Sequence, residues 1–172
     1  MPHVFEQAAT GRAKCRGCGA QIQKGTLRFG ERVPNPYGEG DATYWYHPLC
    51  AAYKRPAAIL EALPSAPPEL TNVDELERAA HATAAHPRLP RVGGAERSPT
   101  GQARCRQCKE AIAKGSWRIR LVFEEEGRFV PSGFLHLGCQ RAYFEGQEIA
   151  PALLHFSRDL SQADRAELIR SL

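Results

Sequence analysis

Apolar and polar residues alternate along two stretches of the chain, 26–33 and 116–123, which read TLRFGERV and SWRIRLVF. A period of two is typical of a strand with one buried face. A loop-like segment and then a second short strand follow each stretch. In the first half the loop covers residues 33–42 and the second strand 43–47. In the second half the loop covers residues 124–133 and the second strand 134–136. The pattern therefore predicts two strands in each half of the chain.

Helical periodicity marks the end of each half. Residues 72–85 place apolar side chains, among them Leu76, on one helical stripe. In the segment 161–172, Ser161 is placed to cap a helix, and Asp164 follows it three residues later. Both segments are predicted to be amphipathic helices. Shorter helices are expected over residues 4–9, 48–54 and 137–145.

The two halves repeat one module. RAKCRGCGAQIQKGTLRF at 12–29 is answered by QARCRQCKEAIAKGSWRI at 102–119, and YHPLC by LHLGC further on. A repeat of this kind indicates two copies of one structural unit. The stretch 86–98 between the copies carries two prolines and two glycines and no periodicity, which is typical of a linker. We expect modules over 1–87 and 98–172, joined by a flexible linker over 88–97.

The totals fit two small domains. The chain has 172 residues, and an isolated half of about 85 residues buries a modest core that is often supported by a metal or disulfides. Residues 1–14 lack the basic-then-apolar order of a secretory signal. We therefore expect an intracellular protein without a membrane segment. Its richness in Ala, Arg, Pro and Gly indicates a GC-rich genome, so bacterial cytoplasm or nucleoid is expected, or the nucleus in a eukaryote.

The net charge of +4 is mild, but the basic residues cluster. They gather around the two cysteine pairs, at Arg12, Lys14, Arg16, Lys24, Arg28 and Arg32, and at Arg97, Arg104, Arg106, Lys109, Lys114, Arg118 and Arg120. Two local basic patches would attract a polyanion. A solvated arginine-rich surface without a partner is the alternative interpretation at this stage.

All six cysteines belong to the repeat, three per copy, and a histidine fills a fourth position. The two sets are Cys15, Cys18, His47 and Cys50, and Cys105, Cys108, His136 and Cys139. The spacing is C-x2-C, an insert of 28 or 27 residues, and H-x2-C. Cys3His sites filled by four protein ligands are structural zinc sites without a position for catalytic water. We predict two structural zinc ions per chain.

Other uses of these cysteines fit less well. A redox C-x2-C would not recur with a matched H-x2-C. Three cysteines per copy cannot form a closed disulfide set, and an iron–sulfur cluster usually takes four thiolates. Structural zinc contributes on the order of 10–16 kcal/mol of apparent binding free energy, which is enough to hold a module this small.

These residues resemble a known family, the PARP-type zinc finger. The resemblance rests on Arg-Ala-Lys-Cys-x-x-Cys, Ile-x-Lys-Gly-x-x-Arg and Trp-Tyr-His-x-x-Cys in the first copy. The family includes the paired fingers of nuclear poly(ADP-ribose) polymerase and the finger of a eukaryotic DNA ligase. The second copy departs from the pattern, because Gln102 replaces Arg12 and Phe134 replaces Trp45. The resemblance covers nearly the whole chain except the linker.

The resemblance implies a small α+β fold for each copy, with an antiparallel sheet, flanking helices and one zinc ion. It also implies shape-based recognition of DNA nicks, gaps and ends, in which arginines hold the backbone and an apolar loop stacks on an exposed base pair. The residues expected to bind DNA are Arg12, Arg16, Lys24, Arg28, Tyr37, Arg106, Lys114, Arg118, Phe129 and Val130. The alternative for the loop residues, Val130 above all, is packing on their own finger. Trp45 and Trp117 are expected in the core.

No catalytic constellation is recognisable in the sequence, so we expect neither an enzyme nor a small-molecule substrate. The favoured hypothesis is a stand-alone, sequence-independent sensor of DNA strand breaks that acts in DNA repair. One alternative is a zinc-stabilised protein-interaction module whose basic face meets an acidic partner. Another is a general DNA-binding adaptor for a separately encoded repair enzyme.

Overall fold

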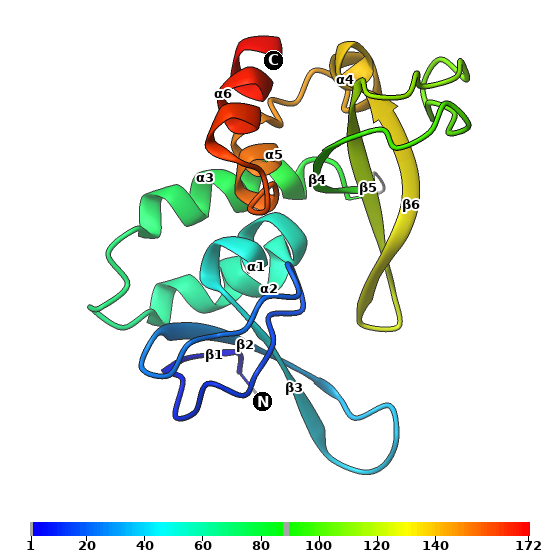
Figure 1. Ribbon diagram of the computed structural model, residues 1–172. Helices are drawn as coiled ribbons and strands as arrows, with labels where there is room; N and C mark the ends of the chain where they lie inside the picture. The colour runs from blue at the N-terminus through cyan, green and yellow to red at the C-terminus, as the bar shows by residue number, and fades with distance from the viewer. Residues whose placement is uncertain (1, 88–89) are drawn as a thin grey trace. The chain divides into compact units, whose positions relative to one another are not determined.

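Two three-stranded antiparallel sheets organise the chain, one in each half (Figure 1). The structure is a computed structural model that describes residues 2–87 and 90–172. The chain divides into two compact units between Pro87 and Arg88. Each unit combines its sheet with short helices, so the small α+β fold expected for each copy is confirmed.

The first unit builds its sheet around β2 (Leu27–Pro34), with β1 (Val4–Gln7) on one side and β3 (Asp41–Tyr46) on the other. The alternating segment is thus the central strand, as its pattern predicts. The helix expected over 4–9 is wrong, because β1 supplies the edge partner that β2 needs. Phe5 of β1 packs against the buried Phe29 of β2, with ring centroids 5.4 Å apart.

Three helices and a single 3-10 turn follow this sheet and lie together in Figure 1. They are α1 (Pro48–Lys54), α2 (Pro56–Ala62), η1 (Leu63–Ser65) and α3 (Val73–Ala84). Proline occupies the first turn of α1 and α2, where its missing N–H costs no hydrogen bond. The stripe predicted for this helix is Val73, Leu76 and Ala80; Leu76 and Ala80 are fully buried and Val73 is partly buried.

The second unit repeats the sheet with β4 (Arg91–Arg97), β5 (Trp117–Glu125) and β6 (Arg128–His136) in that order. The linker expected over 88–97 is therefore wrong from Arg91 onward; Arg88 and Leu89 lie outside the described residues. The glycines that suggested a linker belong to a β-bulge in β4. Gly94 has φ 124°, and a Cβ there would lie 2.6 Å from the carbonyl oxygen of Phe156. The backbone approach itself requires glycine.

The hairpin between β5 and β6 is tighter than the loop expected over 124–133. Glu126 and Gly127 take positive φ values and complete the turn, and β6 begins at Arg128. Phe129 and Val130, which were expected in a loop, are strand residues opposite Glu124 and Phe123. The expected loop is wrong here because the apolar segment pairs with the continuing β5.

The helices of the second unit are η2 (Leu137–Cys139), α4 (Gln140–Tyr143), α5 (Ala150–Phe156) and α6 (Gln162–Ser171). Ser161 accepts a hydrogen bond from the backbone N–H of Asp164, as predicted for the cap of α6. The hydroxyl of Ser157, just past α5, accepts from the N–H of Ala95 in β4. Among the described residues, no helix is long and apolar enough to cross a membrane.

Candidate metal centres and nucleic-acid interface

Each C-x2-C pair sits in a tight turn held by backbone hydrogen bonds. In the first unit, the Cys15 N–H donates to Ala20 O, and the Gly19 N–H donates to Cys15 O, each over 2.8 Å. Gly19 has φ 74°, and the equivalent Lys109 has φ 67°. The turn thus needs a left-handed residue in both copies, and only the first copy supplies a glycine.

The four predicted ligands of the first unit converge. One ligand atom from each of Cys15, Cys18, His47 and Cys50 lies within 4.8 Å of the others. His47 follows β3 and presents Nδ1, which lies 3.5 Å from Cys18 Sγ and 3.9 Å from Cys50 Sγ. Cys50 comes from the first turn of α1. A cysteine turn and a strand-to-helix corner thus close the site from two sides.

The second unit repeats this arrangement with Cys105, Cys108, His136 and Cys139, again within 4.8 Å of one another. Nδ1 of His136 lies 3.4 Å from Cys108 Sγ, and its Nε2 lies 3.2 Å from the Ala111 carbonyl oxygen. A hydrogen bond from Nε2–H to that carbonyl fixes the tautomer that leaves Nδ1 for the metal.

Three thiolates and one imidazole are the donor set that tetrahedral zinc takes in structural sites, and both clusters fit it. Hydrogen bonds to the side chains of Cys15 and Cys18 raise the pKa of His47 to about 9. Because zinc takes the neutral imidazole, metal binding at this site is accompanied by proton release. The two Cys3His zinc-binding sites predicted from the sequence are confirmed.

The two metal sites differ in how well the protein covers them. Cys50 is fully buried, whereas Cys139 is half-buried; Cys18 is half-buried, whereas Cys108 is exposed. Close packing explains the cover in the first unit, because a Cβ at Gly17 would lie 2.8 Å from Cys50 Cβ. In the second copy the equivalent residue is Gln107, which is exposed. The second site is therefore the more open of the two.

The strand arginines expected to bind DNA, Arg28 and Arg118, are both buried and paired. Nη2 of Arg28 donates to Glu6 Oε1 over 2.5 Å, and its guanidinium lies 3.6 Å from the centroid of the Trp45 ring. Nη2 of Arg118 donates to Glu96 Oε1 over 2.6 Å. Each arginine is thus held by a carboxylate from the neighbouring edge strand.

The other basic residues predicted to bind DNA lie at the surface. They are Arg12, Arg16 and Lys24 in the first unit, and Arg106 and Lys114 in the second, all exposed. The Arg16 guanidinium lies 3.5 Å from the centroid of the Tyr44 ring, and Arg106 Nε donates to Ser132 O over 2.8 Å. These contacts orient two of the cations without burying them.

The apolar residues predicted to contact DNA differ in exposure. Tyr37 in the loop between β2 and β3 is 89% exposed, and its backbone N–H donates to the Asn35 side chain. Phe129 and Val130 are partly covered on β6. Phe123, opposite Val130, is 44% exposed and was missed by the sequence analysis. Trp117 is buried as expected, whereas Trp45 is half-buried beneath Arg28.

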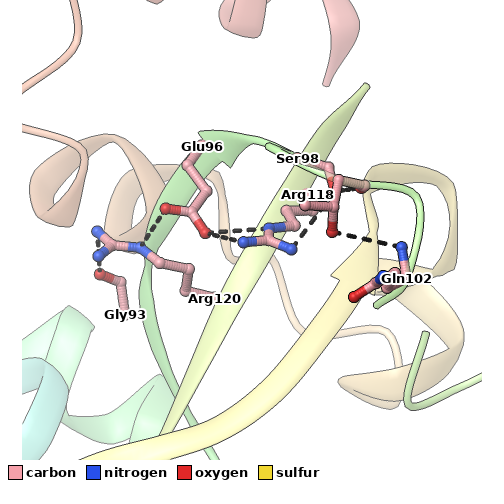
Figure 2. Close-up of polar contacts among 7 residues, drawn as sticks. Gly93, Glu96, Ser98, Gln102, Arg118 and Arg120 are labelled. Carbon is pink, nitrogen blue, oxygen red and sulfur yellow. Dashed lines mark hydrogen bonds and ion pairs between the residues drawn. The ribbon is translucent and has the colours of Figure 1, made fainter. Parts of the chain in front are cut away.

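Two carboxylates were missed from the sequence, and Arg120 was recognised there only as a member of the second basic cluster. Glu6 faces Arg28 across β1 and β2, and Glu96 faces Arg118 across β4 and β5. Glu96 also lies near Arg120, whose Nε is 3.9 Å from Glu96 Oε2 (Figure 2). The alignment of the two copies held the signal, because Glu6 and Glu96 are separated by the same 90 residues as the two C-x2-C pairs.

Comparison with known proteins adds a family and several relatives. The family described as the Poly(ADP-ribose) polymerase and DNA-Ligase Zn-finger region matches residues 6–84. Poly [ADP-ribose] polymerase 1 of Gallus gallus is 30% identical over 133 residues, which cover 69% of this chain and 13% of that protein. Poly [ADP-ribose] polymerase of Drosophila melanogaster is 27% identical over 141 residues, which cover 73% of this chain and 14% of that protein. The chain therefore spans a small part of the length of these curated relatives.

Proposed function

We propose, because residues 6–84 match the poly(ADP-ribose) polymerase and DNA-ligase zinc-finger family, that the two units of this chain are fingers that bind DNA at strand breaks. Finger one denotes the unit Met1–Pro87 and finger two the unit Arg88–Leu172. In this proposal the zinc ions hold the fold and take no part in chemistry, and recognition depends on DNA shape rather than on base sequence.

The observation that carries the proposal is Tyr37. A tyrosine that is 89% exposed, within a loop of Pro, Gly, Asn and Glu, contributes little to the packing of its own finger. A break differs from intact duplex in offering an unstacked base face, and stacking an aromatic ring on a base contributes about 1–3 kcal/mol. Tyr37 is a suitable ring for such a face.

Exposed cations supply the second part of the interaction. Five of the predicted basic residues are exposed and can approach phosphates: Arg12, Arg16 and Lys24 on finger one, and Arg106 and Lys114 on finger two. Such contacts carry no sequence information, and their strength falls with rising salt. The combination predicts binding that is salt-dependent, indifferent to sequence and stronger at a break.

Two fingers suit a nick, because a nick has a duplex stem on either side. Once one finger is bound, the second encounters its stem at a raised effective concentration. We propose that the role is one of binding without catalysis, carried out where the DNA lies, in the nucleoid or the nucleus. A separately encoded repair enzyme is the partner that such a module would recruit.

The test is a competition between nicked and intact duplexes of equal length, with wild type and Tyr37→Ala. We expect wild type to prefer the nicked duplex and the variant to lose most of that preference. Ile169→Ala, which truncates a 51% exposed apolar residue on α6, serves as the matched control and should behave as wild type. Equal affinity of wild type for both duplexes would contradict break recognition, and binding to neither would favour a protein partner.

A further inference from the structure

One of the differences between the two copies lies in the central strand, at a position that belongs to neither motif. Gly30 of β2 is replaced by Arg120 in β5, and the cross-strand neighbour changes from Trp45 to Phe134. The two changes are sterically linked, because a Cβ at Gly30 would lie 2.7 Å from Cζ3 of Trp45 and clash with it. In finger two the smaller ring of Phe134 leaves room for the long side chain of Arg120, which Trp45 would exclude from the equivalent position of finger one.

We propose that Arg120 is the phosphate-binding arginine of the strand face of finger two, and that Arg118 is a positioning residue that holds the carboxylate of Glu96. This inference rests on the proposed function, since it names a group that would hold the DNA backbone. It reverses the expectation from sequence, in which Arg118 was to contact phosphate.

The contacts of Arg118 leave it little capacity for another anion. Its Nε and Nη2 both donate to Glu96 Oε1, over 3.0 and 2.6 Å, and its Nη1 lies 3.4 Å from Ser98 Oγ. The guanidinium carbon lies 3.7 Å from the centroid of the Phe134 ring. With the Arg118 side chain 8% exposed, a phosphate would have to displace Glu96 to reach it.

Arg120 is held differently. Its Nη2 donates to Gly93 O over 3.1 Å, which anchors one corner of the guanidinium, and the side chain remains 43% exposed. Figure 2 shows Glu96 between the two guanidinium groups, with Gly93 beyond Arg120. Glu96 Oε1 lies 2.6 Å from Arg118 Nη2, whereas Glu96 Oε2 lies 3.9 Å from Arg120 Nε. The carboxylate therefore pairs mainly with Arg118. One carboxylate against two arginines leaves a net positive charge at the exposed member.

The Nε of Arg120 is buried beside Glu96 without a hydrogen-bond partner among the described residues, so the exposed part of the side chain is the terminal end of its guanidinium. A planar guanidinium anchored at one corner and exposed at its terminal end is suited to a phosphate oxygen pair. Finger one carries its second strand arginine elsewhere, at Arg32, opposite Thr43. Arg32 of finger one and Arg120 of finger two would thus contact the DNA backbone at different points. This difference would separate the DNA contacts of two otherwise similar fingers.

Salt dependence of DNA binding tests this assignment in the full chain. Arg120→Gln should reduce the slope of log K against log salt by about 0.9, the value for one lost phosphate contact, and weaken low-salt binding about tenfold. Arg170→Gln, at the exposed end of α6, makes the same charge change away from this face and should leave both values as in wild type. Zinc content and melting temperature of Arg120→Gln should also match wild type.

Glu96→Gln is expected to change the low-salt DNA affinity in the direction opposite to Arg120→Gln. Removing a carboxylate that faces phosphate should strengthen low-salt binding severalfold, whereas a purely structural network would weaken binding in both variants. A wild-type slope in Arg120→Gln, or weakened binding in Glu96→Gln, would overturn the assignment while leaving the proposed function in place. If wild type itself fails to bind DNA, the proposed function and this assignment are both overturned.

Discussion

Arg28 in β2 donates to Glu6 in β1 over 2.5 Å, and the two residues are direct cross-strand partners. The same geometry recurs 90 residues later in finger two, where the edge strand again supplies the carboxylate. The pair ties the edge strand to the central strand in both fingers. Its first consequence is therefore for stability.

Arg28→Ala is expected to destabilise finger one by about 1–3 kcal/mol, because it removes a partly buried charge-assisted hydrogen bond and the packing over Trp45. Urea unfolding of the variant, with Glu6→Ala and the double variant to complete a cycle, measures the loss. Non-additive effects of the two single changes are expected. Additive effects, or unchanged stability with weakened DNA binding, would contradict a structural role.

Lys109→Gly is expected to stabilise finger two by about 0.5–1 kcal/mol, because Lys109 takes a left-handed conformation that costs an L-residue energy. Gly19→Ala in the equivalent turn of finger one should act in the opposite direction. Thermal unfolding of the two zinc-loaded variants compares them directly. A loss of stability in Lys109→Gly would show that the hydrogen bond from Lys109 Nζ to Arg106 O outweighs the backbone strain.

Zinc should leave finger two before finger one when a chelator is added. Cys108 is exposed and Cys139 half-buried, whereas Cys50 is fully buried behind the close contact at Gly17. A colorimetric chelator should therefore record two phases of one zinc each. Cys108→Ser should abolish or accelerate the fast phase and leave the slow phase unchanged. A single phase of two zincs would contradict the difference between the sites.

The sequence predicted both metal sites because their ligands repeat at fixed spacing and need no knowledge of tertiary contacts. It predicted β2, β5 and the cap of α6 for a similar reason, since alternation and capping are local signals. The edge strands β1 and β4 were missed because each is stabilised by a partner distant in sequence. The burial of Arg28 and Arg118 was missed for the same reason, since their carboxylate partners lie on those edge strands.

The most direct test of the account is the affinity of the full chain for one duplex, closed or carrying a single nick, across a salt series. We expect steep salt dependence for both forms, from the shared phosphate contacts, and at least about tenfold tighter binding to the nicked form at every salt concentration, from stacking at the break. Equal affinity for the two forms across the series would contradict it.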